Sequence, residues 1–248
     1  MTLTFNSKIP ISPCQMMPSP RSYITEATVS DLKRLPEDIL IHTSYVTKCF
    51  TNNSLTNLSK TTRNLNLYEE IDADILIHGP ASLEEFNNFG LGIELIKKID
   101  INHKFCIEIP AFTKTLTKYV LDNYEPLEFV TLYLDTIIRN NFPIILDTAH
   151  LHSNGLKVED MLYLMNKYKD NFKYLHLNGN ERKQFTSDIH CPITSSNNKI
   201  THVDLLLKSL LKDKIYISES PCNNWEYWVE LSKKYNLKLV NFNENLHY

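Results

Sequence analysis

The chain has 248 residues, of which 42% are hydrophobic and 22% charged, and its formal net charge is −3. This composition is that of a globular protein with one large core, and we expect a single domain over residues 1–248. No stretch is apolar for long enough to span a bilayer, and five scattered cysteines without CxxC spacing argue against a disulfide framework. The first residues lack a basic region followed by a long apolar run, so we expect an intracellular protein without a secretory signal or membrane contact.

Short apolar runs alternate along the chain with segments of helical periodicity. The runs predict strands at residues 10–17, 38–42, 74–78, 104–109, 143–147, 173–177, 214–219 and 237–242. The segments between them predict helices at residues 28–35, 55–70, 82–99, 113–139, 157–169, 201–211 and 224–235. Strands that alternate with helices are typical of a parallel sheet, and eight strands in a chain of this length predict an α/β fold, a single (β/α)8 TIM barrel.

Most of these runs end in a residue that can bind a metal ion. A histidine or carboxylate at the end of an apolar strand is costly to bury unless it is paired or bound to metal. The carboxyl ends of all strands in a barrel open on the same face, so such residues can converge although they lie far apart in sequence. The candidates are His42, His78, Glu108, Asp147, His150, His176 and Glu219, with Asp188 and His190 in the loop after the His176 run.

These residue types predict a site for several divalent ions. Imidazole nitrogens and carboxylate oxygens are the usual ligands of zinc and also suit manganese or iron. Nine such groups exceed what one ion needs and match two or three, and Glu108, on the middle strand of the set, is placed to bridge two ions. Cys191 directly follows His190 and is a further group that could approach a metal. Clustered divalent ions indicate phosphoryl transfer or hydrolysis.

The order and the local sequences of these segments resemble the endonuclease IV family, the zinc-dependent apurinic/apyrimidinic endonucleases. The resemblance lies in IHTSY, ILIHG, CIEIP, IILDTAHLHSNG, YLHLN, SDIH and ISESP, which span about residues 12–222. It implies a xylose-isomerase-like barrel that hydrolyses the phosphodiester on the 5′ side of abasic sites in double-stranded DNA, a step of base excision repair. We expect the protein to act as a monomer.

Position by position, the resemblance implies about three zinc ions, with manganese or iron as alternatives in part of the site. The implied ligands are His42 and His78 for one ion, Asp147, His176 and Glu219 for a second that Glu108 bridges to the first, and His150, Asp188 and His190 for a third. Glu108 and Glu219 would also position the attacking water and thus be catalytic. Tyr45 and Arg21 match residues that the family inserts into the DNA around the extruded nucleotide.

The chain departs from the family pattern at its ends and in one loop. The family's first strand and its glycine-rich loop have no evident counterpart, whereas the segment LKLVNF at 237–242 adds a strand that the family lacks. We therefore predict that this C-terminal strand closes the barrel in place of the missing first strand. The loop after His190 reads CPITSSNNKI instead of the family's glycine-containing segment, which affects substrate contacts near the third ion and not its ligands.

Two other functions remain open. A metal-dependent sugar isomerase or epimerase of the xylose-isomerase-like class uses one or two ions, so the third ligand set distinguishes it from the nuclease. A barrel that binds damaged DNA without cutting it is the other alternative. Four histidines match no ligand position, and we interpret them as surface or loop residues: His103, His152, His202 and His247.

Overall fold

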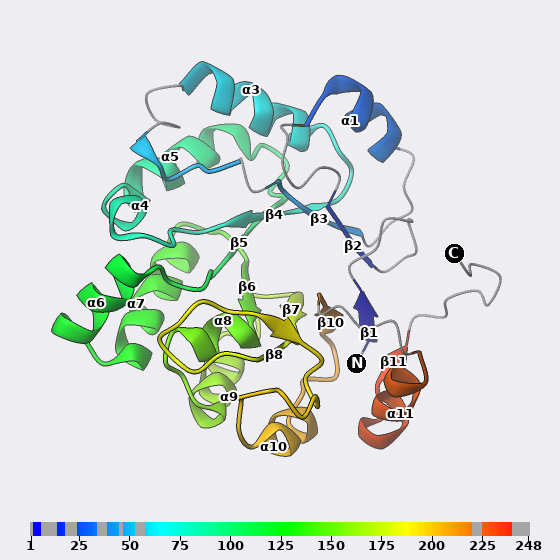
Figure 1. Cartoon of the computed structure of the whole chain (residues 1–248). Helices are drawn as coiled ribbons and strands as arrows, with labels where there is room; N and C mark the ends of the chain where they lie inside the picture. Colours follow the sequence, from blue (N-terminus) through cyan, green and yellow to red (C-terminus); the bar gives the residue numbers. More distant parts are fainter. Residues whose placement is uncertain are drawn as a thin grey trace.

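The computed structural model describes residues 2–5, 14–17, 24–33, 39–44, 47–52, 58–219 and 225–239. Its strands lie in a ring near the centre, and most of its helices lie outside that ring (Figure 1). The ring is one sheet in which every pair of neighbouring strands is parallel. In sheet order the strands are β11 (Lys238–Leu239), β1 (Thr2–Phe5), β10 (Ile215–Ser218), β7 (Tyr174–His176), β6 (Ile144–Asp147), β5 (Phe105–Glu108), β4 (Asp74–His78), β3 (Ile39–His42) and β2 (Cys14–Met16).

Helices on the outside cover the sheet through their apolar faces. They are α1 (Glu26–Leu32), α3 (Leu58–Glu69), α4 (Leu83–Asn87), α5 (Phe89–Ile99), α6 (Lys114–Asn123), α7 (Pro126–Arg139), α9 (Val158–Lys167), α10 (Val203–Lys208) and α11 (Trp225–Tyr235). A short helix, α8 (Thr148–Ser153), follows β6 directly, and a small hairpin of β8 (Gly179–Asn180) and β9 (His190–Cys191) follows β7. Within the described ranges, no helix has both the length and the apolar character that crossing a membrane requires.

The predicted TIM-like barrel is confirmed, and each predicted strand contains an observed one. Two predicted helices are each split in two. The segment 82–99 breaks at Asn88, which ends α4 and begins α5. The segment 113–139 breaks before Pro126, the first residue of α7, because the residue before a proline avoids the helical conformation.

The prediction that the C-terminal strand replaces a missing first strand is wrong. Thr2–Phe5 forms β1, which pairs with β10 so that Thr2 lies opposite Ile215. β11 pairs along the other edge of β1, with Leu239 opposite Leu3, and so extends the wall beyond the first strand. Among the described residues no pairing joins β2 to β1 or β11, which leaves one open seam, although β1 and β2 contact each other.

The barrel interior is built in two layers by the alternation of side chains along each strand. One inward-facing set is a separate apolar cluster, here called the apolar layer, made of Leu40, Leu76, Cys106, Ile145, Tyr174 and Ile217. Residues between these positions, such as Ile41, Ile77 and Leu146, belong to the main core between strands and helices. Side chains two residues apart on a strand face the same side. The residue two positions after each member of the apolar layer therefore also faces inward, and these residues form the polar layer: His42, His78, Glu108, Asp147, His176 and Glu219.

Candidate metal centre

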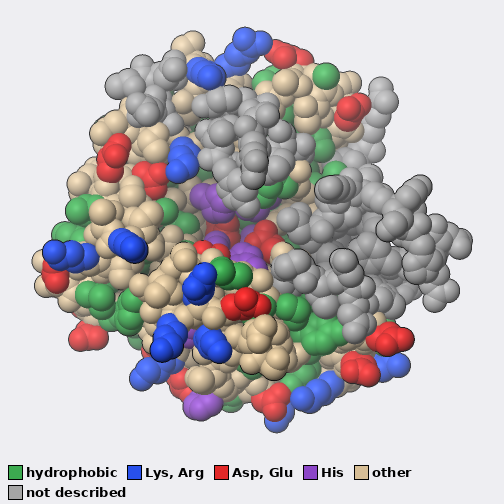
Figure 2. All heavy atoms as spheres, in the orientation of Figure 1, with side chains coloured by type: hydrophobic (Ala, Val, Ile, Leu, Met, Phe, Trp, Pro, Cys, Tyr) green, Lys and Arg blue, Asp and Glu red, His purple; other side chains and the backbone are tan. Residues whose placement is uncertain are grey.

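Three groups of side chains in and beside the polar layer bring their potential ligand atoms within 4.8 Å of one another. The groups are His42, His78 and Glu108; Glu108, Asp147, His176 and Glu219; and Asp147, His150 and His190. Glu108 and Asp147 each belong to two groups, so the three groups form one continuous centre. Figure 2 shows histidine and acidic side chains gathered in the hollow at the middle of this face.

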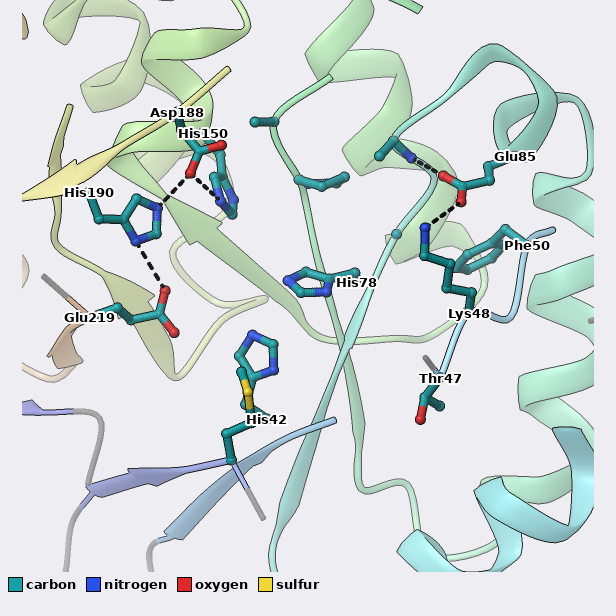
Figure 3. A pocket seen from close by; sticks show the side chains of 15 residues that line it. His42, Thr47, Lys48, Phe50, His78, Glu85, His150, Asp188, His190 and Glu219 are labelled. Carbon is teal, nitrogen blue, oxygen red and sulfur yellow. Dashed lines mark hydrogen bonds and ion pairs between the residues drawn. The ribbon is translucent and has the colours of Figure 1, made fainter. Parts of the chain in front are cut away.

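Asp188 completes the set at the third group. Its Oδ2 lies 3.0 Å from His190 Nε2 and 3.6 Å from His150 Nε2, and these three side chains point toward one another in Figure 3. The structure thus brings together all nine side chains that the sequence indicated. Asp147, which we expected beside His176 and Glu219, also lies near the third group, with its Oδ2 3.8 Å from His190 Nε2.

Asp147 is held in place by the start of α8 and by an asparagine. Its Oδ1 accepts hydrogen bonds from the backbone N–H groups of Ala149 (2.6 Å) and His150 (3.0 Å), which makes it the N-cap of that helix. Asn178 donates from Nδ2 to Asp147 Oδ2 (2.8 Å) and accepts from the backbone N–H of Glu219 (2.9 Å). One buried asparagine therefore ties the carboxylate of Asp147 to the backbone of Glu219.

Hydrogen bonds also fix which ring nitrogen each histidine presents. His42 Nδ1 donates to the carbonyl of Thr43 (2.8 Å), and His150 Nδ1 donates to the carbonyl of Ile109 (3.0 Å). Both residues thereby turn Nε2 toward the centre. His176 is oriented the other way, with Nδ1 only 2.8 Å from Glu108 Oε1.

The buried charges shift the pKa values of these groups strongly. Burial alone would raise the pKa of Glu108, but the nearby imidazoles of His176 and His150 outweigh it and hold that pKa well below its usual range. The same balance, with His150 and His190 as the partners, lowers the pKa of Asp147 to about 2. Burial opposes a charge on His150, yet Asp147 and Glu108 raise its pKa to about 10. Without ions, protons on histidine supply the positive charge that the carboxylates need.

The residues present fit divalent ions. Glu108 Oε2 and His190 Nε2 are buried and have no hydrogen-bond partner among the described residues, although each lies near another member of the centre. Burial, and next the charge of His78, lowers the pKa of His42 to about 4, so this imidazole is neutral and able to bind a metal at pH 7. Imidazole nitrogens and carboxylate oxygens that lie this close together are what a cluster of zinc, manganese or iron ions requires.

A cavity of about 470 Å³ opens above the centre. His42, His78 and Glu219 line its floor, and Lys48 and Phe50 stand at another side (Figure 3). Lys48 Nζ lies 3.7 Å from Glu85 Oε1, in the capping box that begins α4. No role of Lys48 was predicted from the sequence, whereas Tyr45 and Arg21, which were predicted to contact DNA, lie outside the described residues.

Two residues that support the centre were missed from the sequence, namely Gln15 on β2 and Asn178 after β7. Both are fully buried amides next to predicted ligands. The available signal was a polar amide within an apolar run. Two other expectations need correction. Cys191 joins none of the ligand groups, and burial raises the pKa of its thiol to about 11. His152, which we interpreted as a surface or loop residue, is buried in α8.

Comparison with known proteins shows a likeness in structure only. The sequence matches no protein-family model and none of the curated proteins. Endonuclease IV from Thermus thermophilus superposes with a TM-score of 0.61 at 17% identity, over 91% of this chain and 89% of that one. The chain has the fold of endonuclease IV. The AP endonuclease crystallised as AsfvAP:AG is also similar, with a TM-score of 0.58 and 17% identity over 90% of this chain and 83% of that one.

Weaker structural matches include an isomerase. A sugar phosphate isomerase/epimerase from Parabacteroides distasonis matches with a TM-score of 0.48 and 11% identity, over 90% of this chain and 85% of that one. This likeness is too weak to weigh for or against a function. A fold does not determine an activity, so the candidate centre itself has to distinguish an endonuclease from an isomerase.

Proposed function

We propose that this chain is a metal-dependent endonuclease that hydrolyses the phosphodiester 5′ to abasic sites in duplex DNA. The observation that carries the proposal is the continuity of the three ligand groups through Glu108 and Asp147. An isomerase needs only one or two ions, and the ligand group around His150 and His190 would then have no purpose. Three adjacent ions use every group, and they suit a substrate whose scissile phosphate carries charge on several oxygens.

In this proposal the three groups hold about three zinc ions, with manganese or iron as alternatives, and Asp188 completes the third group. When bound, the ions supply Lewis acidity and positive charge at the phosphate. We propose that Glu219, whose side chain lines the cavity, orients the attacking water. Glu108 has no exposed surface and lies beneath the cavity floor, where it contributes by joining two groups.

The substrate contacts belong to the mouth of the barrel. Tyr45 and Arg21 are proposed to insert beside the extruded abasic nucleotide. Lys48 adds a cation to the wall of the cavity, within reach of a phosphate that enters it. The proposal includes a single domain that acts as a monomer on double-stranded DNA.

The test is a nicking assay with zinc-loaded protein and a labelled duplex that contains one tetrahydrofuran abasic analogue. We expect one cut on the 5′ side of the analogue, none in the intact duplex, and loss of cutting in His176→Ala. His202→Ala is the matched control, because His202 is exposed and pairs with Glu159 away from the centre. Equal cutting by His176→Ala, or no cutting with zinc, manganese or iron, would refute the proposal.

Two further outcomes would favour the alternatives. One ion per chain by mass spectrometry, together with isomerisation of a sugar, would indicate the isomerase. Tight binding of the abasic duplex without turnover would indicate the non-cutting DNA binder.

A further inference from the structure

We propose that Gln15 is a positioning residue that fixes His176 and Glu219 in the orientation in which they bind a metal ion. The inference rests on the metal centre of the proposed function and is independent of the substrate. Gln15 lies on β2, opposite Leu40 of the apolar layer, and has no exposed surface. An amide buried at that level is costly unless both of its ends are hydrogen-bonded.

Both ends of the Gln15 amide contact ligands of the centre. Its Nε2 donates to Glu219 Oε1, and its Oε1 lies 2.7 Å from His176 Nε2. A carboxylate oxygen can only accept, so the NH₂ group must face Glu219 and the carbonyl must face His176. The carbonyl can only accept as well, and His176 therefore carries a proton on Nε2.

This arrangement determines which atoms are left for a metal ion. With Nε2–H held by Gln15, His176 presents Nδ1, which lies 2.8 Å from Glu108 Oε1 and 3.5 Å from Asp147 Oδ2. With Oε1 held, Glu219 presents Oε2, which lies 3.4 Å from the same Nδ1. One side chain thus directs two ligands of the second group toward a common point.

His176 differs in this respect from His42 and His150. Backbone carbonyls of Thr43 and Ile109 hold the rings of His42 and His150, and no substitution can remove them. For His176 the corresponding acceptor is the side chain of Gln15, which a substitution can remove. Removal of such a supporting partner typically costs about 10- to 100-fold in metal affinity.

The experiment compares zinc-loaded wild type with Gln15→Met, which keeps the size of the side chain and loses both hydrogen bonds. Asn64→Leu is the control: it removes another buried amide, on α3, that donates to Thr47 Oγ1 (3.0 Å), a residue that lines the cavity and belongs to none of the ligand groups. Zinc affinity is measured by competition with a chromophoric chelator, and the protonated ring nitrogen of His176 by long-range ¹H–¹⁵N NMR. We expect Gln15→Met to lose about 10- to 100-fold in affinity for one zinc ion and Asn64→Leu to lose none.

The proposal is overturned if Gln15→Met binds zinc as tightly as wild type, or if the control weakens zinc binding equally. Should Gln15→Met fail to fold, Gln15→Glu carries the test, because one oxygen of its carboxyl group can still accept from His176 Nε2–H. In that variant we expect His176 to keep its proton on Nε2, and a proton on Nδ1 instead would contradict the inference. Neither readout involves DNA, so a protein that meets these expectations without nicking abasic DNA would refute the proposed function alone.

Discussion

The apolar layer and the polar layer of the barrel lie two residues apart on the same six strands, with Glu219 directly after the end of β10. Leu40 precedes His42, Ile145 precedes Asp147, and Tyr174 precedes His176. The backbone is equivalent in the two layers, and only the side-chain chemistry differs. Burial of each large apolar side chain stabilises the fold by about 1.5–3 kcal/mol, whereas a buried charge costs free energy unless it is paired. Stability and function are therefore separated within single strands.

The largest expected effect comes from two separate substitutions on β6, one in each layer. Asp147→Asn removes a carboxylate shared by two ligand groups, and we expect nicking of abasic DNA to fall by at least about a hundredfold. Ile145→Ala, on the same strand, leaves a cavity in the apolar layer and should cost about 2–5 kcal/mol of unfolding free energy. Its zinc content and its nicking rate per folded molecule should stay within a few-fold of wild type.

Urea unfolding, metal analysis and nicking rates of the two variants provide the measurement. If Ile145→Ala lost its zinc as completely as Asp147→Asn, the layers would not be separable, and the comparison between them would fail.

The two layers should also differ in their dependence on pH when no metal is bound. His150 has its pKa raised from 6.5 to about 10, so its stabilisation is complete below pH 6.5 and is lost as the pH rises through about 10. Asp147 has its pKa lowered from 3.8 to about 2, so its stabilisation is lost as the pH falls through about 2. His42, with its pKa lowered to about 4, opposes the fold increasingly as the pH falls from 6.5 through 4.

Unfolding free energies of the metal-free protein between pH 3 and pH 10 should therefore be greatest near about pH 6.5 and fall on both sides. Ile145→Ala should lower this curve by the same amount at every pH, since no charge is changed. Zinc binding at pH 7 should release protons, because His150 is protonated in the metal-free protein and must lose its proton to bind. Calorimetry in buffers of different ionisation enthalpy measures that release, and its absence would contradict the assignment of His150 as a ligand.

The polar layer could be predicted from the sequence because each ligand ends its own apolar run. Glu108 in FCIEIP and His176 in YLHLN are visible without knowledge of any other strand. The supporting residues are different in kind. The role of Gln15 depends on the pairing of β2 with β3 and on side chains that are distant in the sequence. His176, for example, lies 161 residues further along the chain. Such a contact between distant segments leaves no local pattern.

The errors in the fold have local causes. TLTF at residues 2–5 is a short alternating strand without a long apolar run, so the first strand was missed and its place was assigned to 237–242. The break before Pro126 was predictable from the proline itself. The roles of Tyr45 and Arg21 stay predictions.

The smallest expected effect concerns Gly79, which joins the polar layer to the outer helices. Gly79 follows His78, and its N–H donates to the carbonyl of Glu108 (2.9 Å). A Cβ at this position would overlap the hydroxyl of Tyr133 on α7 and lie 3.1 Å from that same carbonyl. We expect Gly79→Ala to cost about 1–3 kcal/mol of unfolding free energy, because the overpacked side chain must displace a buried ring.

Tyr133→Phe removes the overlapping hydroxyl together with its hydrogen bond to the carbonyl of Pro80 (3.1 Å), which should cost about 0.5–1.5 kcal/mol alone. In the double variant the nearest ring atom, Cζ, lies 3.1 Å from the new Cβ, so most of the clash is relieved. The two costs should therefore sum to more than the cost of the double variant, as measured by urea unfolding. Strict additivity would show that the strain arises at the carbonyl of Glu108 instead, and the polar layer would then be disturbed through its own backbone and not through the outer helix.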